Sequence, residues 1–138
     1  LIQIKQNMAK LTEEMKKFFG ERDPGVVFIG TSSKKGVPNV VAKGTFVKIL
    51  DDETLAYADV FSRKTLENVK ENPYVAMAVI NAKTFKGYQF KGRAEILTEG
   101  LLVEEAKKQN PQVQSVTTIK VEEIYLLDYG PEAGKRLA

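Results

Sequence analysis

The sequence contains neither cysteine nor histidine. Without cysteine the chain has no disulfide and no thiolate nucleophile, and without histidine it lacks the side chain that most often moves protons near neutral pH. Zinc sites of the usual cysteine and histidine type are excluded as well. Any chemistry must be carried by other groups, and the sequence identifies no catalytic side chain and no metal site.

Long apolar runs are also missing. No run approaches the roughly 20 residues that a membrane helix needs, and the first residues lack the apolar core and cleavage site of a secretory signal. We therefore expect a cytoplasmic protein with no membrane partner. Met8 has the character of a natural start, so we interpret residues 1–7 as a tag or an upstream extension. The rest, residues 8–138, has the length and apolar content of one domain.

The chain carries only a mild excess of positive charge. The formal net charge is +3 and the isoelectric point is about 9.0. A dedicated nucleic-acid-binding protein usually shows a denser basic face, with aromatic side chains arranged for stacking on bases. Three aromatic residues gather in FKGYQF at 85–90, but they form no obvious basic and aromatic platform. Nucleic-acid binding is therefore the weakest alternative, and we expect no nucleic-acid partner.

Short alternating and β-branched runs dominate the chain and predict a mainly β protein with some α (α+β). Apolar residues at helical spacing predict a first helix, with Leu11, Met15, Phe18 and Phe19 on one face. Two more helices are expected at 62–73 and 101–109. Strands are expected at 26–32, 39–50, 54–59, 74–81, 85–98 and 117–129. Hairpin connections between these six strands favour a small closed antiparallel barrel.

Four small or basic polar residues, Ser62 to Thr65, open the helix expected at 62–73. Cations are locally unfavourable at a helix N-terminus unless an anion joins them, because the helix dipole is already positive there. Two hydroxyls, a guanidinium and an ammonium beside free N–H groups match the charge and geometry of a phosphate. The alternative is a solvated helix start with Ser62 as N-cap. On four residues alone, that alternative is the simpler interpretation.

A longer pattern surrounds this motif. A hairpin, a long strand, an Asp-rich turn and a short strand precede S-R-K-T, and ENVKENPYVAMAV follows it. From Val26 to Leu97 the chain resembles the FMN-binding split-barrel family, which includes the pyridoxamine 5′-phosphate oxidases. The C-terminal IYLLDYGPEAGKRL is similar to the end of short family members. The resemblance implies a six-stranded antiparallel split β-barrel with flanking short helices and an FMN cofactor.

The resemblance also implies which positions meet the cofactor. The flavin phosphate would be held at the helix start by Ser62, Arg63, Lys64 and Thr65. The preceding strand end would border the ribityl chain and ring through Tyr57, Ala58 and Asp59. Within 41–45, the strand backbone would lie along the ring edge at Val41, Ala42 and Lys43.

A second subunit is the last implied element of the site. In many family members side chains of the partner complete the flavin site, and the matching positions here are Gln89 and Lys91. The alternative is that these alternating polar residues simply face solvent. Strands that are apolar on both faces, such as 74–81, exceed what one small barrel buries. We therefore expect a homodimer with the flavin near its interface.

The activity that this resemblance implies is that of a flavin-dependent oxidoreductase on an unidentified small substrate or electron partner. True pyridoxamine 5′-phosphate oxidases contact substrate through an arginine and a histidine in a further C-terminal segment, and this chain has no histidine. Vitamin B6 oxidation is therefore not expected. A flavin carries its own redox chemistry. Lys43 would stabilise the reduced ring, or would be an ordinary surface lysine. Two alternatives stay open: a non-catalytic flavin-binding module, and the same fold with a deazaflavin.

Overall fold

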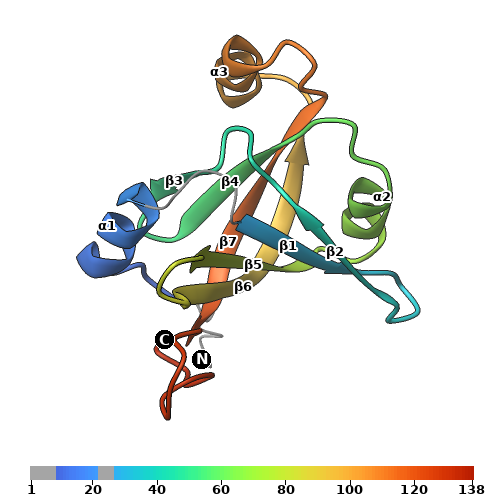
Figure 1. Cartoon of the computed structure of the whole chain (residues 1–138). Helices are drawn as coiled ribbons and strands as arrows, with labels where there is room; N and C mark the ends of the chain where they lie inside the picture. Colours follow the sequence, from blue (N-terminus) through green and yellow to red (C-terminus); the bar gives the residue numbers. More distant parts are fainter. Residues whose placement is uncertain (1–8, 22–26) are drawn as a thin grey trace, which may run out of the picture.

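A computed structural model describes residues 9–21 and 27–138. The predicted tag or extension at 1–7 and Met8 lie outside the described residues, as does Val26 at the start of the first predicted strand. Three helices are present in the described part: α1 (Glu13–Glu21), α2 (Lys64–Glu71) and α3 (Leu101–Gln109). They lie at separate positions around one curved sheet (Figure 1). None of these described helices has the length and apolarity needed to span a membrane.

The sheet is antiparallel throughout and contains seven strands in the described residues. Their order in space is β2-β1-β5-β6-β7-β4-β3. Their bounds are β1 Val27–Ser32, β2 Pro38–Ala42, β3 Lys48–Asp51, β4 Thr54–Asp59, β5 Tyr74–Asn81, β6 Lys86–Leu97 and β7 Ser115–Leu126. The predicted mainly β antiparallel fold is confirmed, whereas the predicted number of six strands is wrong.

The seventh strand arises because the predicted strand 39–50 is two strands. β2 pairs with β1 at one edge of the sheet, and β3 pairs with β4 at the other edge. Between them the chain bends, with Phe46 at a positive φ of 52°. Residues on both faces of 39–50 are partly apolar, so the pattern does not reveal where the chain changes partner. The segment between β2 and β3 thus runs from one edge strand to the other. It contacts β4 on the way, where the Ala58 N–H donates to the Thr45 carbonyl at 3.0 Å.

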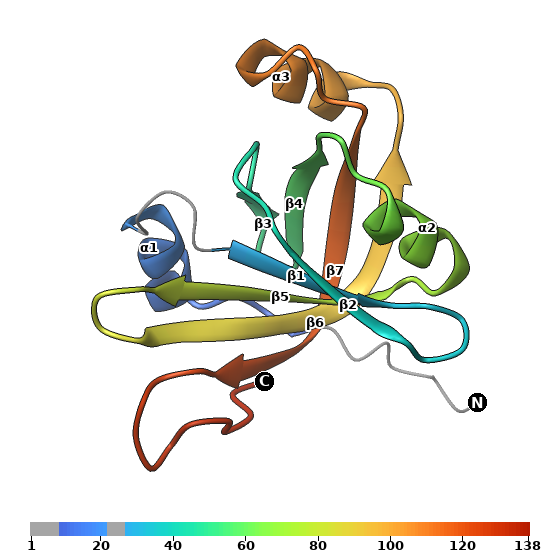
Figure 2. The same cartoon turned by 45° about the vertical axis from the view of Figure 1, so that its right-hand side comes forward.

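Two glycines permit the close packing of β6 against its neighbours. A Cβ at Gly92 would lie 1.9 Å from the Lys120 carbonyl oxygen, and one at Gly87 would lie 2.2 Å from the Val79 carbonyl oxygen. The pairing with β7 shifts register beside Gly92, and Figure 2 shows β6 changing direction part-way along its length. Glycine inside a strand often marks such a bend or close backbone approach, because any side chain would clash there.

The core has two parts that share strand β4. Inside the barrel, Leu55 and Tyr57 of β4 join the main cluster with Ile29, Met77 and Phe90. On the opposite face of β4, two alanines pack under α3 in a smaller cluster that contains Phe46, Ala56, Ala58, Val103, Ala106, Val113 and Val116. All six residues of β4 are therefore buried. The strand is a rigid support for the residues that follow it, because both of its faces are packed.

Candidate functional site

A pocket of about 350 Å³ lies where the connection from β4 enters α2. Its walls come from the end of β2 and from the β4–α2 connection. The lining residues are Val41, Ala42, Lys43, Val60, Phe61, Ser62, Arg63, Lys64 and Thr65. The fold thus brings together the two sequence-predicted segments at 41–43 and 62–65. A ligand here would contact both segments at once.

Helix α2 begins without a side-chain cap. Arg63 occupies the N-cap position, and among the described residues no side chain caps the first turn. Ser62 is therefore not the N-cap, and the capped helix start considered from the sequence is wrong. Lys64 lies 3.5 Å from Glu67, but both side chains are more than half exposed, so this pair compensates little of the local charge. The first turn offers uncapped N–H groups in a positive environment, which suits an anion.

Beneath this helix start, Thr65 belongs to a buried polar network. Asn39 of β2 donates from Nδ2 to the hydroxyls of Thr65 at 3.3 Å and Thr31 at 3.4 Å. Asn68 donates to the same Thr31 hydroxyl at 3.1 Å. The Thr65 oxygen accepts, so its proton is available to a further acceptor. The network fixes α2 against β1 and β2.

Sequence reasoning missed Asn39 and Asn68. The signal for Asn39 is its inward position in β2, opposite Thr31 in the pairing with β1. The signal for Asn68 is its spacing of three residues from Thr65, which places both on the buried face of α2. Neither signal is strong, because polar residues at such positions are common on surfaces.

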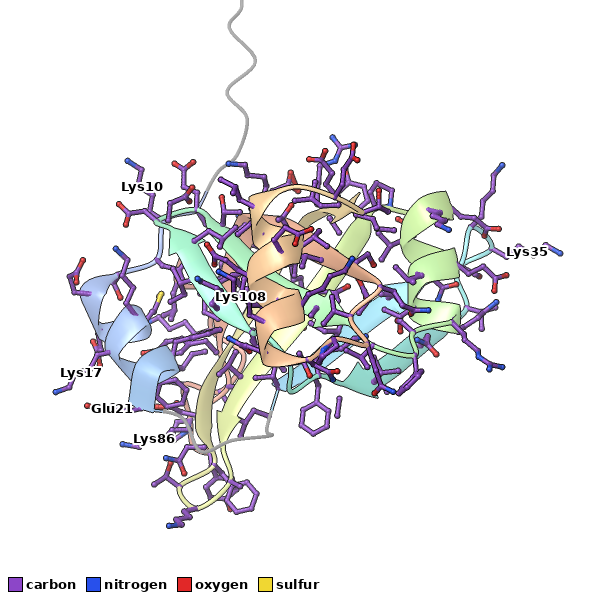
Figure 3. The ribbon with its side chains drawn as sticks, turned by 90° about the horizontal axis from the view of Figure 1, so that it is seen from above. Lys10, Lys17, Glu21, Lys35, Lys86 and Lys108 are labelled. Carbon is purple, nitrogen blue, oxygen red and sulfur yellow. The ribbon has the colours of Figure 1, made fainter. Side chains whose placement is uncertain are left out.

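Lys43 lines the pocket together with the cations Arg63 and Lys64, and it is mostly buried, with 9% of its side chain exposed. Its Nζ lies 3.2 Å from Ser62 Oγ and 3.5 Å from Asp59 Oδ1. It also lies 5.3 Å from the centroid of the Tyr57 ring. Other lysines differ: Lys10, Lys17, Lys35 and Lys86 point away from the barrel (Figure 3). The interpretation of Lys43 as an ordinary surface lysine is therefore wrong.

Asp59 lies directly below Lys43 and is fully buried. Its Oδ2 accepts hydrogen bonds of 2.8 Å from Ser115 Oγ and from Thr117 Oγ1 of β7. Tyr57 points into the barrel like Asp59, since alternate residues of β4 share one face. Burial, and then the charge of Asp59, raise the pKa of Tyr57 well above its usual range, while Thr117 opposes this. Ala58 faces the cluster under α3. None of these three predicted residues lines the pocket, although Asp59 forms an ion pair with Lys43, which does.

Gln89 and Lys91 lie elsewhere, on the outer face of the sheet. Lys91 is paired with Ala76 of β5, and Gln89 with Ala78. The Lys91 ammonium lies 4.7 Å from the centroid of the Tyr125 ring. Three strand spacings, about 14 Å, separate β6 from β2 across the sheet. The fold does not bring these two residues into the pocket of their own chain.

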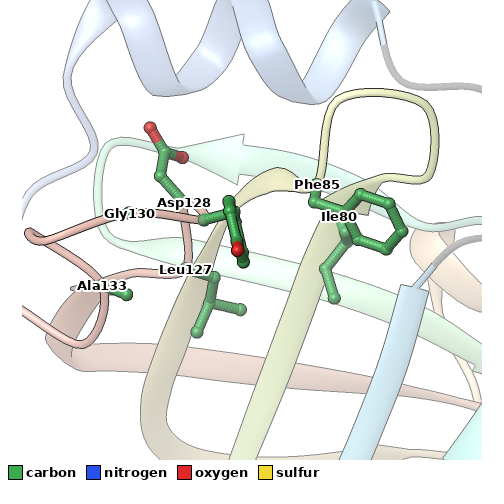
Figure 4. Close-up of a pocket in the computed structure, with 7 residues that line it drawn as sticks. Ile80, Phe85, Leu127, Asp128, Gly130 and Ala133 are labelled. Atoms are coloured by element: carbon green, nitrogen blue, oxygen red, sulfur yellow. The ribbon is translucent and has the colours of Figure 1, made fainter.

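A larger cavity, of about 580 Å³, lies between the β5–β6 turn and the C-terminal segment. In Figure 4, Ile80 and Phe85 stand on one side of it, and Asp128, Gly130 and Ala133 on the other. No lysine or arginine is among its described lining residues. The Asp128 carboxylate, which does line it, accepts a hydrogen bond of 3.1 Å from the Gly87 N–H. Size alone does not make it a phosphate site, because an anion there would meet Asp128 and no cation.

Comparison with known proteins identifies the family. The family model described as pyridoxamine 5′-phosphate oxidase matches residues 11–128. This chain belongs to the pyridoxamine 5′-phosphate oxidase family. The resemblance to split-barrel proteins that the sequence suggested is confirmed.

Individual members of this fold are similar over most of the chain. An uncharacterized protein of Methanocaldococcus jannaschii is 43% identical, over 96% of this chain and 91% of its own. The crystal structure of HupZ from Group A Streptococcus has a TM-score of 0.75 at 32% identity, covering 90% of this chain and 99% of its own. An FMN-binding protein from Syntrophomonas wolfei has a TM-score of 0.72 at 17% identity, covering 86% of each chain, and shows the shared fold alone.

In this member of the pyridoxamine 5′-phosphate oxidase family, the residues around the pocket fit a phosphorylated flavin. The start of α2 supplies uncapped N–H groups, the Thr65 hydroxyl has a proton to donate, and two cations stand beside it. Lys43 supplies a further donor on the side of β2. A phosphate at one end and a polar ring edge at the other would both find donors.

Proposed function

We propose that the protein binds FMN in the pocket at the start of α2. The phosphate lies among Ser62, Arg63, Lys64 and Thr65, and the ring extends along residues 41–43 toward the outer face. The observation that carries this proposal is the uncapped, cationic start of α2 in a pocket that also contains the mostly buried Lys43. Membership of the pyridoxamine 5′-phosphate oxidase family supports it, because that family binds flavin-type cofactors.

The cofactor site is completed, in our proposal, by a second copy of the chain. The pocket volume of about 350 Å³ is near the lower end of the range for ligand sites, roughly 300 to 1,000 Å³. Phe61 on its rim is 70% exposed, and on the adjoining outer face Val40 is 69% exposed. Gln89 and Lys91 lie on the same outer face, paired with small alanines. In a homodimer through this face, the partner's copies of these two side chains would reach the flavin.

The flavin, when bound, supplies hydride and electron chemistry at its own ring. The chain holds the phosphate, orients the ring through the strand end at 41–43, and shields one side of it from water. We therefore propose a flavin-dependent oxidoreductase that acts on a small substrate or an electron partner.

The visible spectrum of the freshly purified protein tests the cofactor. We expect a yellow protein, quenching of FMN fluorescence on titration into the apoprotein, and FMN as the mass of the released ligand. A released ligand with the mass of a deazaflavin would mean that the same site binds a different cofactor. Absence of any flavin binding would refute the proposal. Anaerobic NADH or NADPH then tests turnover: bleaching of the bound flavin no faster than that of free FMN would indicate a non-catalytic binding module.

A further inference from the structure

Lys43 of the pocket forms a buried ion pair with Asp59 at the end of β4. Asp59 and Lys43 lie 3.5 Å apart, with 0% and 9% of their side chains exposed. Lys43 lines the same pocket as Lys64, whose side chain is 55% exposed. We infer that Asp59 is a positioning residue that fixes the Lys43 ammonium toward the cofactor pocket and cancels most of its charge there. This inference rests on the proposed flavin site.

The surroundings of Asp59 select a carboxylate. The hydroxyls of Ser115 and Thr117 donate to one oxygen. The other oxygen forms the ion pair with the Lys43 ammonium and accepts no hydrogen bond within the described residues. An ionised carboxylate is an acceptor only, so it suits the two hydroxyls on one side and the ammonium on the other, whereas an amide would turn a donor toward one of these groups. Ser115 lies directly opposite Asp59 in the pairing of β4 with β7, so the sheet itself sets the carboxylate.

The position of Lys43 follows from that fixed carboxylate. Its Nζ is held between Asp59 Oδ1 and Ser62 Oγ, which lies on the pocket wall. A lysine side chain has four rotatable bonds and is otherwise free to move. The pair therefore replaces a mobile cation with a fixed donor at the strand end that borders the ring.

The charge consequence distinguishes the two ends of the pocket. Buried opposite charges at this distance are weakly screened, so Asp59 offsets the field of Lys43 in the space above it. The start of α2 keeps its positive potential, because Glu67 is exposed and screened by water. The site thus accepts one anionic group at α2 and a neutral hydrogen-bond acceptor at Lys43. A negative charge that develops on the ring during reduction is stabilised less than it would be by an unpaired lysine.

Substitution of Asp59 by asparagine tests this inference. Asp59→Asn removes the charge while keeping the shape, so Lys43 becomes an unpaired cation. We expect reduced FMN to bind about tenfold more tightly relative to oxidised FMN. For a two-electron couple that ratio raises the midpoint potential by about 30 mV. Glu104→Gln, which removes an exposed charge on α3, is the matched control and should leave the potential unchanged.

A double-mutant cycle guards against a merely structural effect. Lys43→Gln alone leaves the Asp59 charge unpaired, so we expect a lower midpoint potential and weaker FMN binding than in the wild type. The double variant with Asp59→Asn removes both charges and should return the potential toward the wild-type value. A double variant whose potential stays as low as that of Lys43→Gln alone would overturn the inference, because the Asp59 charge would then have no effect on the pocket. If Asp59→Asn alone fails to fold, the potentials of Lys43→Gln and of the double variant are compared instead.

Inorganic phosphate provides a test that needs no flavin. We expect Asp59→Asn to bind phosphate several-fold more tightly than the wild type in thermal-shift titrations, because the pocket gains one positive charge. Equal phosphate affinities would contradict the charge cancellation. If the wild-type protein binds no FMN, the proposed function fails, and the phosphate titration still decides on the role of Asp59.

Discussion

The pocket contains two kinds of cation, which differ in burial and in the acidic partner that they have. At the start of α2, Lys64 is 55% exposed and its acidic partner Glu67 is 62% exposed. Beside the end of β4, Lys43 is mostly buried and its partner Asp59 is completely buried. The first arrangement leaves a net positive field for an incoming anion, whereas the second makes a fixed donor with little net charge. Charge alone does not distinguish them; burial and pairing do.

The largest effect on binding is expected from the cations at the start of α2. Arg63→Ala together with Lys64→Ala should weaken FMN binding by about 3 to 6 kcal/mol, taking roughly 1.5 to 3 for each charge-assisted bond to one phosphate. Isothermal titration calorimetry measures it. The matched control is Lys107→Ala with Lys108→Ala on α3, which removes the same charge from exposed positions. An unchanged affinity in the first variant would place the phosphate elsewhere.

The corresponding change at the buried pair should act on folding. Asp59→Ala leaves Lys43 without its partner and two hydroxyls without their acceptor, so we expect a loss of about 3 to 5 kcal/mol in the free energy of unfolding. Urea denaturation followed by circular dichroism measures the loss. Arg63→Ala serves as the comparison, because removal of an exposed cation should change stability by less than about 0.5 kcal/mol. A similar stability for both variants would remove the contrast between the two regions.

Tyr57, whose ring lies next to Lys43, should affect how the stability of the protein changes at alkaline pH. The pKa of Tyr57 is raised in the folded state, first by burial and then by the charge of Asp59. The stability that this contributes is fully present below the unfolded pKa of about 10 and is lost as the pH rises toward the folded-state pKa. Tyr57→Phe should flatten this part of the curve. An identical alkaline decline in the variant would show that other groups cause it.

The smallest effect is expected on the outer face of the sheet. Lys91→Ala should weaken FMN binding by about 1 kcal/mol if the partner's side chain reaches the flavin, since one polar contact is typically worth that much. Lys120→Ala, an exposed lysine of β7, is the control. Sedimentation or light scattering reports the oligomeric state in parallel. A loss of affinity without loss of the dimer supports the cross-subunit contact, and no change in either contradicts it.

Much of the fold could be predicted because the signals are local. The strand expected at 54–59 is β4, that at 74–81 is β5, and the helix at 101–109 is α3. The division of 39–50 into β2 and β3 could not be predicted. Which edge strand a segment pairs with depends on contacts far away in the sequence, and a segment apolar on both faces gives no sign of the change.

For the candidate site, the sequence by itself determined the cluster of hydroxyls and cations at the start of α2. The residues Ser62 to Thr65 are adjacent in the chain, so their hydroxyls and charges are neighbours in any fold that begins a helix there. Only the tertiary structure decided that Lys43 joins them and that Asp59 lies beneath it. Asp59 and the hydroxyl of Ser115 are 56 positions apart in the chain. The physical reason is that burial and ion pairing are properties of distant segments brought together by the sheet, and no local pattern encodes them.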